Sequence, residues 1–187
     1  YISAGNQYFL LNIPSEKRFY PESKKIIPIS LTNQNSDKAS GKLTIKIESL
    51  EAPTKTKVST YWKTAEFYNN SESEYENLLP TYTFGDTAKK NVWNTLNQLD
   101  SKSVEIDGSF DYELPDLPAG HYKLTVAQKD AISASSFIEI VDRNKTPVLI
   151  PLAIASDTSV YQPGDEAKVN IYSSYDNMIA YVDILKI

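Results

Sequence analysis

The stretch Lys42-Leu-Thr-Ile-Lys-Ile-Glu48 alternates between apolar side chains and charged or hydroxyl-bearing ones. Successive side chains of a β-strand point to opposite sides, so Leu43, Ile45 and Ile47 share one face of an extended chain. Such alternation is typical of an antiparallel strand with one face on a core and the other in water. The stretch therefore predicts a half-buried strand.

The same period of two recurs along the chain. Ser109–Leu114 and His121–Ala127 repeat it clearly, and weaker candidates are Tyr8–Ile13, Ile26–Thr32, Val104–Asp107, Ser136–Val141, Leu149–Ala155, Glu166–Ser173 and Ile179–Ile187. Short strands separated by Pro, Gly and Asn clusters favour a sandwich of two sheets. We therefore expect an all-β fold, namely an immunoglobulin/fibronectin-like β-sandwich.

One region, from about residue 59 to residue 100, lacks this alternation. Within it, Ser71 precedes acidic residues and an apolar pair that ends at Pro80, which predicts one short helix with Ser71 as its N-cap. A structureless loop of this length is uncommon in a compact domain. We therefore expect a partly helical, ordered insertion. Among its aromatic residues, Tyr61, Trp62, Phe67, Tyr68, Tyr82 and Trp93 form the cluster of most interest.

This aromatic cluster allows two interpretations. Aromatic side chains dominate buried cores, so Trp62, Phe67, Tyr82 and Trp93 are expected mainly as packing, either inside the insertion or at an interface with a neighbouring domain. The alternative is a carbohydrate-binding platform, in which flat rings stack on sugar faces. Exposed, coplanar tryptophans would favour the second interpretation.

A domain boundary is predicted at the polar run Arg143–Pro147. The segment that opens at Tyr20 resembles the one that opens at Tyr161, since in each a Tyr/Pro turn leads into an alternating strand. We expect a first β-sandwich at residues 1–145, with the insertion, and the first strands of a second sandwich at 147–187. The second domain is expected to be truncated, and the chain to be a piece of a longer protein.

Composition excludes several classes of site. The chain has 187 residues, a formal charge of −5, one histidine and no cysteine. Thiolate catalysis and Cys-ligated metals are therefore excluded, as is any site that needs two imidazoles. A mildly acidic chain without a basic stripe is not expected to bind nucleic acid. No apolar run reaches the roughly 18 to 20 residues of a membrane span.

No catalytic or metal-binding constellation emerges from the remaining residues. His121 follows Gly120 at the start of a strand, and we expect it to be structural or solvent-facing, since no orienting acid or nucleophile accompanies it in sequence. Glu72, Glu74, Glu76 and Asp116 do not match a calcium loop. We expect no enzyme activity, no cofactor and no metal.

Three segments carry a resemblance to a known family. Tyr161-Gln-Pro-Gly-Asp-Glu-Ala167 resembles the Y-x-P-G-[DE]-x-[AV] motif of macroglobulin-type (MG) domains in the alpha-2-macroglobulin superfamily, and Leu114–Leu124 resembles their L-x-x-G-x-Y-x-L motif. Tyr61-Trp62, Leu79–Tyr82 and Val92-Trp93 resemble an insertion in one MG domain of bacterial, Bacteroidetes-type relatives. Pro163, Gly164 and Asp165 suit a tight turn, and Gly120 suits another.

The resemblance implies a function as well as a fold. It implies a structural module of a secreted or envelope-anchored, broad-spectrum protease inhibitor that traps proteases when its stacked MG domains collapse. The implied partners are neighbouring MG domains of the same chain and, through the full-length protein, proteases. The implied location is extracytoplasmic. The family's thioester requires a cysteine that this chain lacks. The alternative function is a carbohydrate-binding or adhesive module of a bacterial surface protein.

Overall fold

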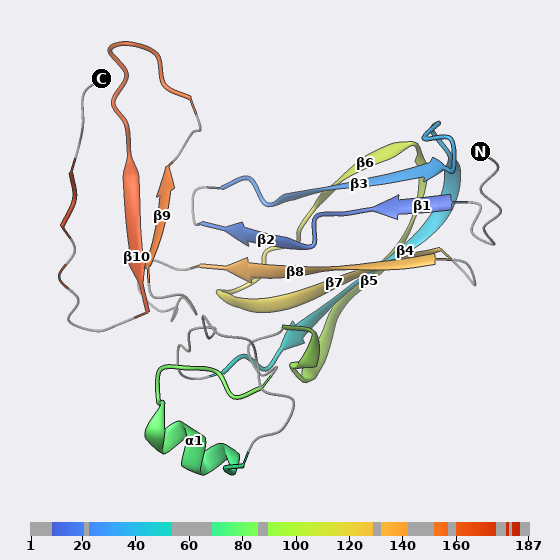
Figure 1. Ribbon diagram of the computed structural model, residues 1–187. Helices are drawn as coiled ribbons and strands as arrows, with labels where there is room; N and C mark the ends of the chain where they lie inside the picture. The colour runs from blue at the N-terminus through green and yellow to red at the C-terminus, as the bar shows by residue number, and fades with distance from the viewer. Residues whose placement is uncertain are drawn as a thin grey trace. The chain divides into compact units, whose positions relative to one another are not determined.

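The protein is all-β, and its strands form a sandwich of two sheets in this computed structural model (Figure 1). The structure describes residues 9–20, 23–53, 69–85, 90–128, 132–141, 152–156, 160–174, 179 and 181–183. By its internal contacts the chain divides into two compact units. The first comprises residues 1–52 and 93–146, and the second comprises 53–92 and 147–187.

The first unit contains both sheets of the sandwich. The smaller sheet has the strand order β1-β3-β6, formed by β1 (Phe9–Asn12), β3 (Ile26–Asn33) and β6 (Ser109–Glu113). The larger sheet has the order β2-β8-β7-β4-β5, formed by β2 (Glu16–Phe19), β8 (Ile132–Ile140), β7 (Gly120–Gln128), β4 (Ser40–Leu50) and β5 (Thr95–Asp107). Neighbouring strands are antiparallel, except that β2 runs parallel to β8. Figure 1 shows the two sheets as two layers.

The core lies between these layers and follows the period of two in the sequence. Leu43, Ile45 and Ile47 of β4 are at most 1% exposed, as the alternation predicted. They pack with inward residues of both sheets, of which Phe19, Ile27, Ile29, Leu31, Tyr112, Leu124, Val126 and Ile138 are fully buried. Burial of this apolar face is the main stabilising contribution to the sandwich.

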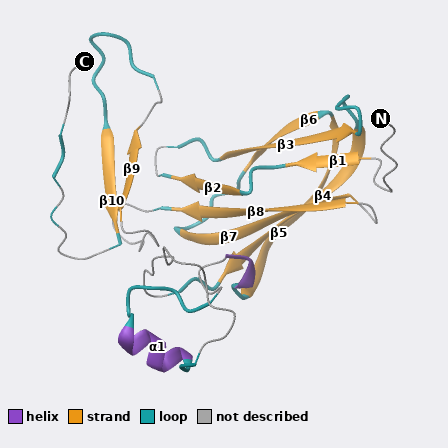
Figure 2. Cartoon of the chain, viewed as in Figure 1, coloured by secondary structure: helices purple, strands orange, loops and turns teal. Residues whose placement is uncertain are grey.

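The second unit contains one α-helix and one β-ribbon among its described residues (Figure 2). Helix α1 spans Glu72–Leu78, and Ser71 is its N-cap, which confirms the prediction. The 3-10 turn η1 spans Lys90–Val92 and comes just before β5. In the ribbon, β9 (Leu152–Ser156) pairs antiparallel with β10 (Val169–Ser173).

The strand predictions differ most from the structure in three places. Strand β2 was not anticipated, and β5 begins at Thr95, nine residues before the predicted Val104. The predicted strand Ile179–Ile187 is wrong where it is described, because Ile179 and residues 181–183 are not in a strand. No helix in the described part of the chain is long and apolar enough to cross a membrane.

Candidate functional site

The Tyr161–Asp165 segment forms a tight turn held by its own side chains. The Asp165 carboxylate accepts a hydrogen bond of 2.7 Å from the backbone N–H of Gln162, and the Asp165 N–H donates to the Gln162 carbonyl at 3.0 Å. Gly164 has a φ of 100°, a backbone conformation that favours glycine. The Tyr161 hydroxyl and Ser156 Oγ share a hydrogen bond of 2.5 Å. The turn is therefore attached to the end of β9.

The predicted turn at Gly120 is held by the tyrosine that follows it. The Tyr122 hydroxyl donates a hydrogen bond of 2.7 Å to the Pro118 carbonyl, and burial raises the pKa of this phenol. A similar bond, from a tyrosine to backbone a few residues upstream, forms the tyrosine corner of immunoglobulin-type sandwiches. A Cβ on Gly120 would lie 3.3 Å from the Tyr122 hydroxyl, so glycine leaves room for the bond.

The predicted aromatic cluster is only partly described. Tyr82 and Trp93 are both half-buried, whereas Trp62 and Phe67 lie outside the described residues. Trp93 contacts the imidazole of His121 edge-on, with ring centroids 5.3 Å apart and an angle of 88° between the planes. Within the second unit, Tyr75 and Phe84 make a similar edge contact at 5.3 Å.

An ion pair that sequence inspection missed lies next to His121. Glu139 of β8 is 2% exposed; its Oε2 accepts a hydrogen bond of 2.8 Å from Arg18 Nε and lies 2.6 Å from Arg18 Nη2 in an ion pair. Burial alone lowers the pKa of Arg18, but the charge and hydrogen bond of Glu139, together with Tyr20, outweigh that effect and raise it. The sequence signal was a lone acid inside the apolar run Phe137–Val141.

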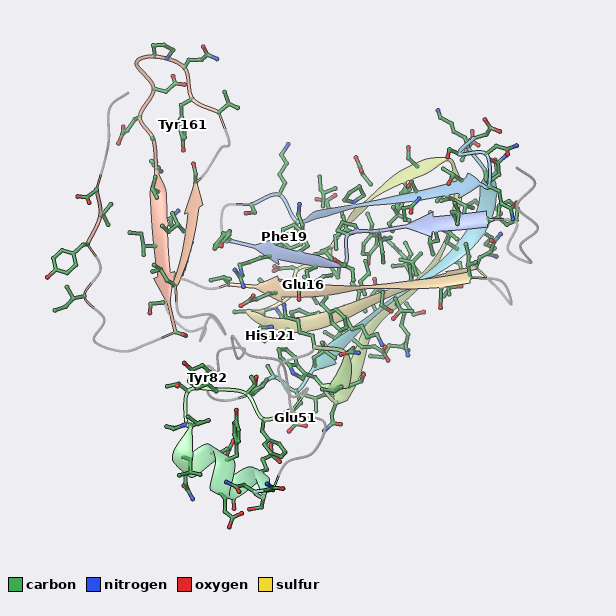
Figure 3. All side chains as sticks on the ribbon, in the orientation of Figure 1. Glu16, Phe19, Glu51, Tyr82, His121 and Tyr161 are labelled. Atoms are coloured by element: carbon green, nitrogen blue, oxygen red, sulfur yellow. The ribbon has the colours of Figure 1, made fainter. Side chains whose placement is uncertain are left out.

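His121, Glu139 and Arg18 occupy one row across three strands. His121 of β7 stands directly opposite Glu139 of β8, and Glu139 stands opposite Arg18 of β2. His121 is 8% exposed and is therefore buried rather than solvent-facing. We call Arg18, Glu139 and His121 the polar row. Figure 3 shows His121 and Glu51 at the same end of the larger sheet.

The chain leaves the first unit for residues 53–92, and returns to it, beside the polar row. The Glu51 N–H donates to the Asn94 carbonyl at 2.9 Å, and Asn94 Nδ2 donates to Glu51 Oε2 at 3.1 Å. Trp93, the first residue of the returning chain, contacts His121. We call this double hydrogen bond between Glu51 and Asn94 the neck. It fixes the two chain segments side by side where β4 ends and β5 begins.

Two of the acidic residues that were considered as a calcium site, Glu74 and Asp116, have partners in the structure. Glu74 completes a capping box with Ser71, and Asp116 forms a long ion pair of 3.7 Å with Lys25. Hydrogen bonds from the backbone and side chain of Ser71 lower the pKa of Glu74. Among the described residues, no three His, Cys, Asp or Glu side chains are grouped so that they could hold a metal ion.

The fold defines the class of protein as an all-β sandwich domain with an accompanying β-ribbon. A comparison with protein-family models gave no match, and neither did a comparison with curated proteins. The fold and the local geometry therefore carry the functional argument.

Proposed function

We propose that the chain is a structural, non-enzymatic module of an alpha-2-macroglobulin-like, broad-spectrum protease inhibitor. In this role the sandwich transmits a collapse of stacked MG domains around a protease. The observation that supports the proposal best is a β-sandwich followed along the chain by a β-ribbon, with one motif-like turn in each. The first turn ends at Gly120 and is fixed by Tyr122, and the second is fixed by Asp165.

An uncovered apolar face on the β-ribbon adds support for a role in domain packing. The register places Leu152, Ile154, Val169 and Ile171 on the same face of β9–β10, and each is between 42% and 65% exposed. A two-stranded ribbon is marginally stable by itself, so such a face is stabilised by packing against a further layer. In the proposed function that layer belongs to a neighbouring MG domain of the same protein, in an extracytoplasmic location.

The functional test requires the full-length protein that contains this chain. It is mixed with a broad-specificity protease, and residual activity is compared on a large protein substrate and on a small chromogenic peptide. Entrapment predicts loss of activity on the large substrate with activity on the peptide retained. Equal activity on both substrates, repeated for serine, cysteine and metalloproteases, would contradict the proposal.

The contact between Trp93 and His121 supports packing over a carbohydrate platform. A half-buried tryptophan ring that already contacts an imidazole has less free surface for stacking on a sugar. Tryptophan emission is therefore expected to stay constant when mixed glycans are added to the chain. A saturable change that disappears in both Trp62→Phe and Trp93→Phe would favour the carbohydrate-binding or adhesive module instead.

A further inference from the structure

The polar row contains a buried acceptor atom that the described residues leave unused. The hydrogen bond from Arg18 Nε and the ion-pair contact of Arg18 Nη2 both go to Oε2 of Glu139, whereas Oε1 is buried and has no hydrogen-bond partner within the described part of the chain. A buried carboxylate oxygen without a donor costs free energy, because it has lost its hydration without gaining a bond. A donor that arrives at Oε1 is therefore stabilising.

His121 is placed to supply that donor. Residues directly opposite each other on antiparallel strands have Cβ atoms about 4.5 to 5.5 Å apart, and His121 and Glu139 are such a pair. A neutral imidazole has one N–H, whereas an imidazolium has two and a positive charge. The free side chain gains this second proton at about pH 6.5, so mild acidification changes the donors that face Glu139.

The surrounding charges are balanced around this pair. On the same face, β2 contributes Arg18 and Glu16, β7 contributes Lys123, and β4 contributes Glu48 opposite Lys123. Glu51 follows β4 and is bonded to Asn94 in the neck. Because Arg18 already binds Oε2, Oε1 is the Glu139 oxygen that can still accept from a charged imidazole. Glu48 is directly opposite Lys123 and forms an ion pair of 2.5 Å with Lys46, which lies on the same face of β4.

We propose that His121 makes a pH-dependent contact that links the larger sheet to the neck. Its protonation places an N–H donor on Oε1 of Glu139 and holds the imidazole ring in the orientation against which Trp93 packs. The imidazole of His121 contacts Trp93, and Trp93 precedes Asn94 in the chain. His121 is therefore connected to the neck through Trp93. The neck is then held more firmly at pH 5.5 than at pH 8. This inference does not depend on the proposed function.

The chain allows a clean test, because His121 is the only histidine and Trp93 is one of only two tryptophans. In a Trp62→Phe background, emission reports Trp93 alone, and an adjacent imidazolium quenches indole fluorescence. We expect emission to fall in a single transition between pH 8 and pH 5. The transition should be absent in His121→Gln. In Glu139→Gln it should move to lower pH by about half a unit or more, a threefold or larger loss in proton affinity.

A matched control and a second measurement keep the proposal open to refutation. Glu48→Gln removes a carboxylate from the same face away from His121, and it should leave the transition unchanged. If Glu139→Gln does not fold, nitrogen-15 NMR spectra of the unsubstituted chain at pH 5.5 test whether His121 donates a hydrogen bond to Glu139. They should show an imidazolium N–H protected from exchange with water. An unprotected N–H, or a transition that persists in His121→Gln, would overturn the proposal.

Discussion

The hydroxyl of Tyr112 on β6 donates a hydrogen bond of 3.3 Å to the Asp100 carboxylate on β5 and so joins the two sheets of the sandwich. Lys102, two residues further along β5, lies 4.3 Å from the centre of the Tyr112 ring. One fully buried aromatic residue of the smaller sheet is therefore held by two charged residues of the larger one. Burial and the nearby charge of Asp100 raise the pKa of Tyr112 to about 12.

This link predicts a loss of stability at alkaline pH. The folded state favours the neutral phenol, so its contribution is intact below pH 10 and is lost as the pH rises from 10 towards 12. Tyr112→Phe should lower the free energy of unfolding at pH 8 by about 0.5 to 1.5 kcal/mol and should flatten the alkaline decline. Urea unfolding at pH 8, 10 and 11.5 measures both effects. Tyr181→Phe, at a residue 93% exposed, is the control and should change neither.

The ion pair of Arg18 with Glu139 should be costly to break. Arg18→Ala leaves a carboxylate that is 2% exposed without its partner, and we expect a loss of about 3 to 5 kcal/mol in urea unfolding at pH 7. Lys46→Ala is the matched control, because the pair of Lys46 with Glu48 is more exposed. It should cost at most about 1 kcal/mol. Equal losses in the two variants would show that the burial of Glu139 is not decisive.

The connection between β5 and β6 depends on Gly108, whose φ is 77°. Its carbonyl accepts from the Leu31 N–H, and its N–H donates to the Ala39 carbonyl, so the backbone cannot relax freely. Gly108→Ala should lower the free energy of unfolding by about 1 to 2 kcal/mol, since a Cβ is disfavoured in this conformation. Ser36→Gly tests the opposite sign at a φ of 66° and should be neutral or stabilising by up to about 1 kcal/mol. Thermal unfolding of both variants measures the contrast.

Helix α1 should depend on its capping box and on pH. Ser71→Ala removes the side-chain acceptor for the Glu74 N–H and should destabilise the helix locally by about 0.5 to 2 kcal/mol. Because the pKa of Glu74 is lowered in the folded state, its contribution is present above the ordinary pKa and is lost as the pH falls through the lowered value. Hydrogen exchange of the Tyr75 and Leu79 amides reports both changes. Glu72→Gln should retain the pH dependence.

Residues that follow a local rule were predictable from the sequence. The alternation in β4, β6 and β7 reflects the burial of one strand face, and Ser71 with Glu74 is a local capping signal. Strand β2 was missed because Glu16-Lys-Arg-Phe19 is short and polar and becomes a strand only through pairing with β8. Strand β5 was underestimated because it lies at a sheet edge, where most of its side chains face water and show no alternation.

The polar row was not predictable, because its pairing is not local. Arg18 and Glu139 are 121 residues apart in sequence, and only the parallel register of β2 with β8 brings them together. His121 could be placed at the start of a strand, but its neighbour across the sheet could not be named. The domain limits and the resemblance to MG domains stay predictions, as do the roles of Trp62 and Phe67, which lie outside the described residues.

The neck also has a consequence for how the protein can vary among relatives. Since β4 and β5 are antiparallel neighbours, residues 53–92 are topologically a single hairpin connection, closed at its base by Glu51 and Asn94. The length of such a connection can change without altering the order of any strand in the sandwich, and its entropic cost rises only slowly with length. This segment is thus a position where evolution, or a designer, can exchange forty residues for a short turn while the sandwich keeps its connectivity.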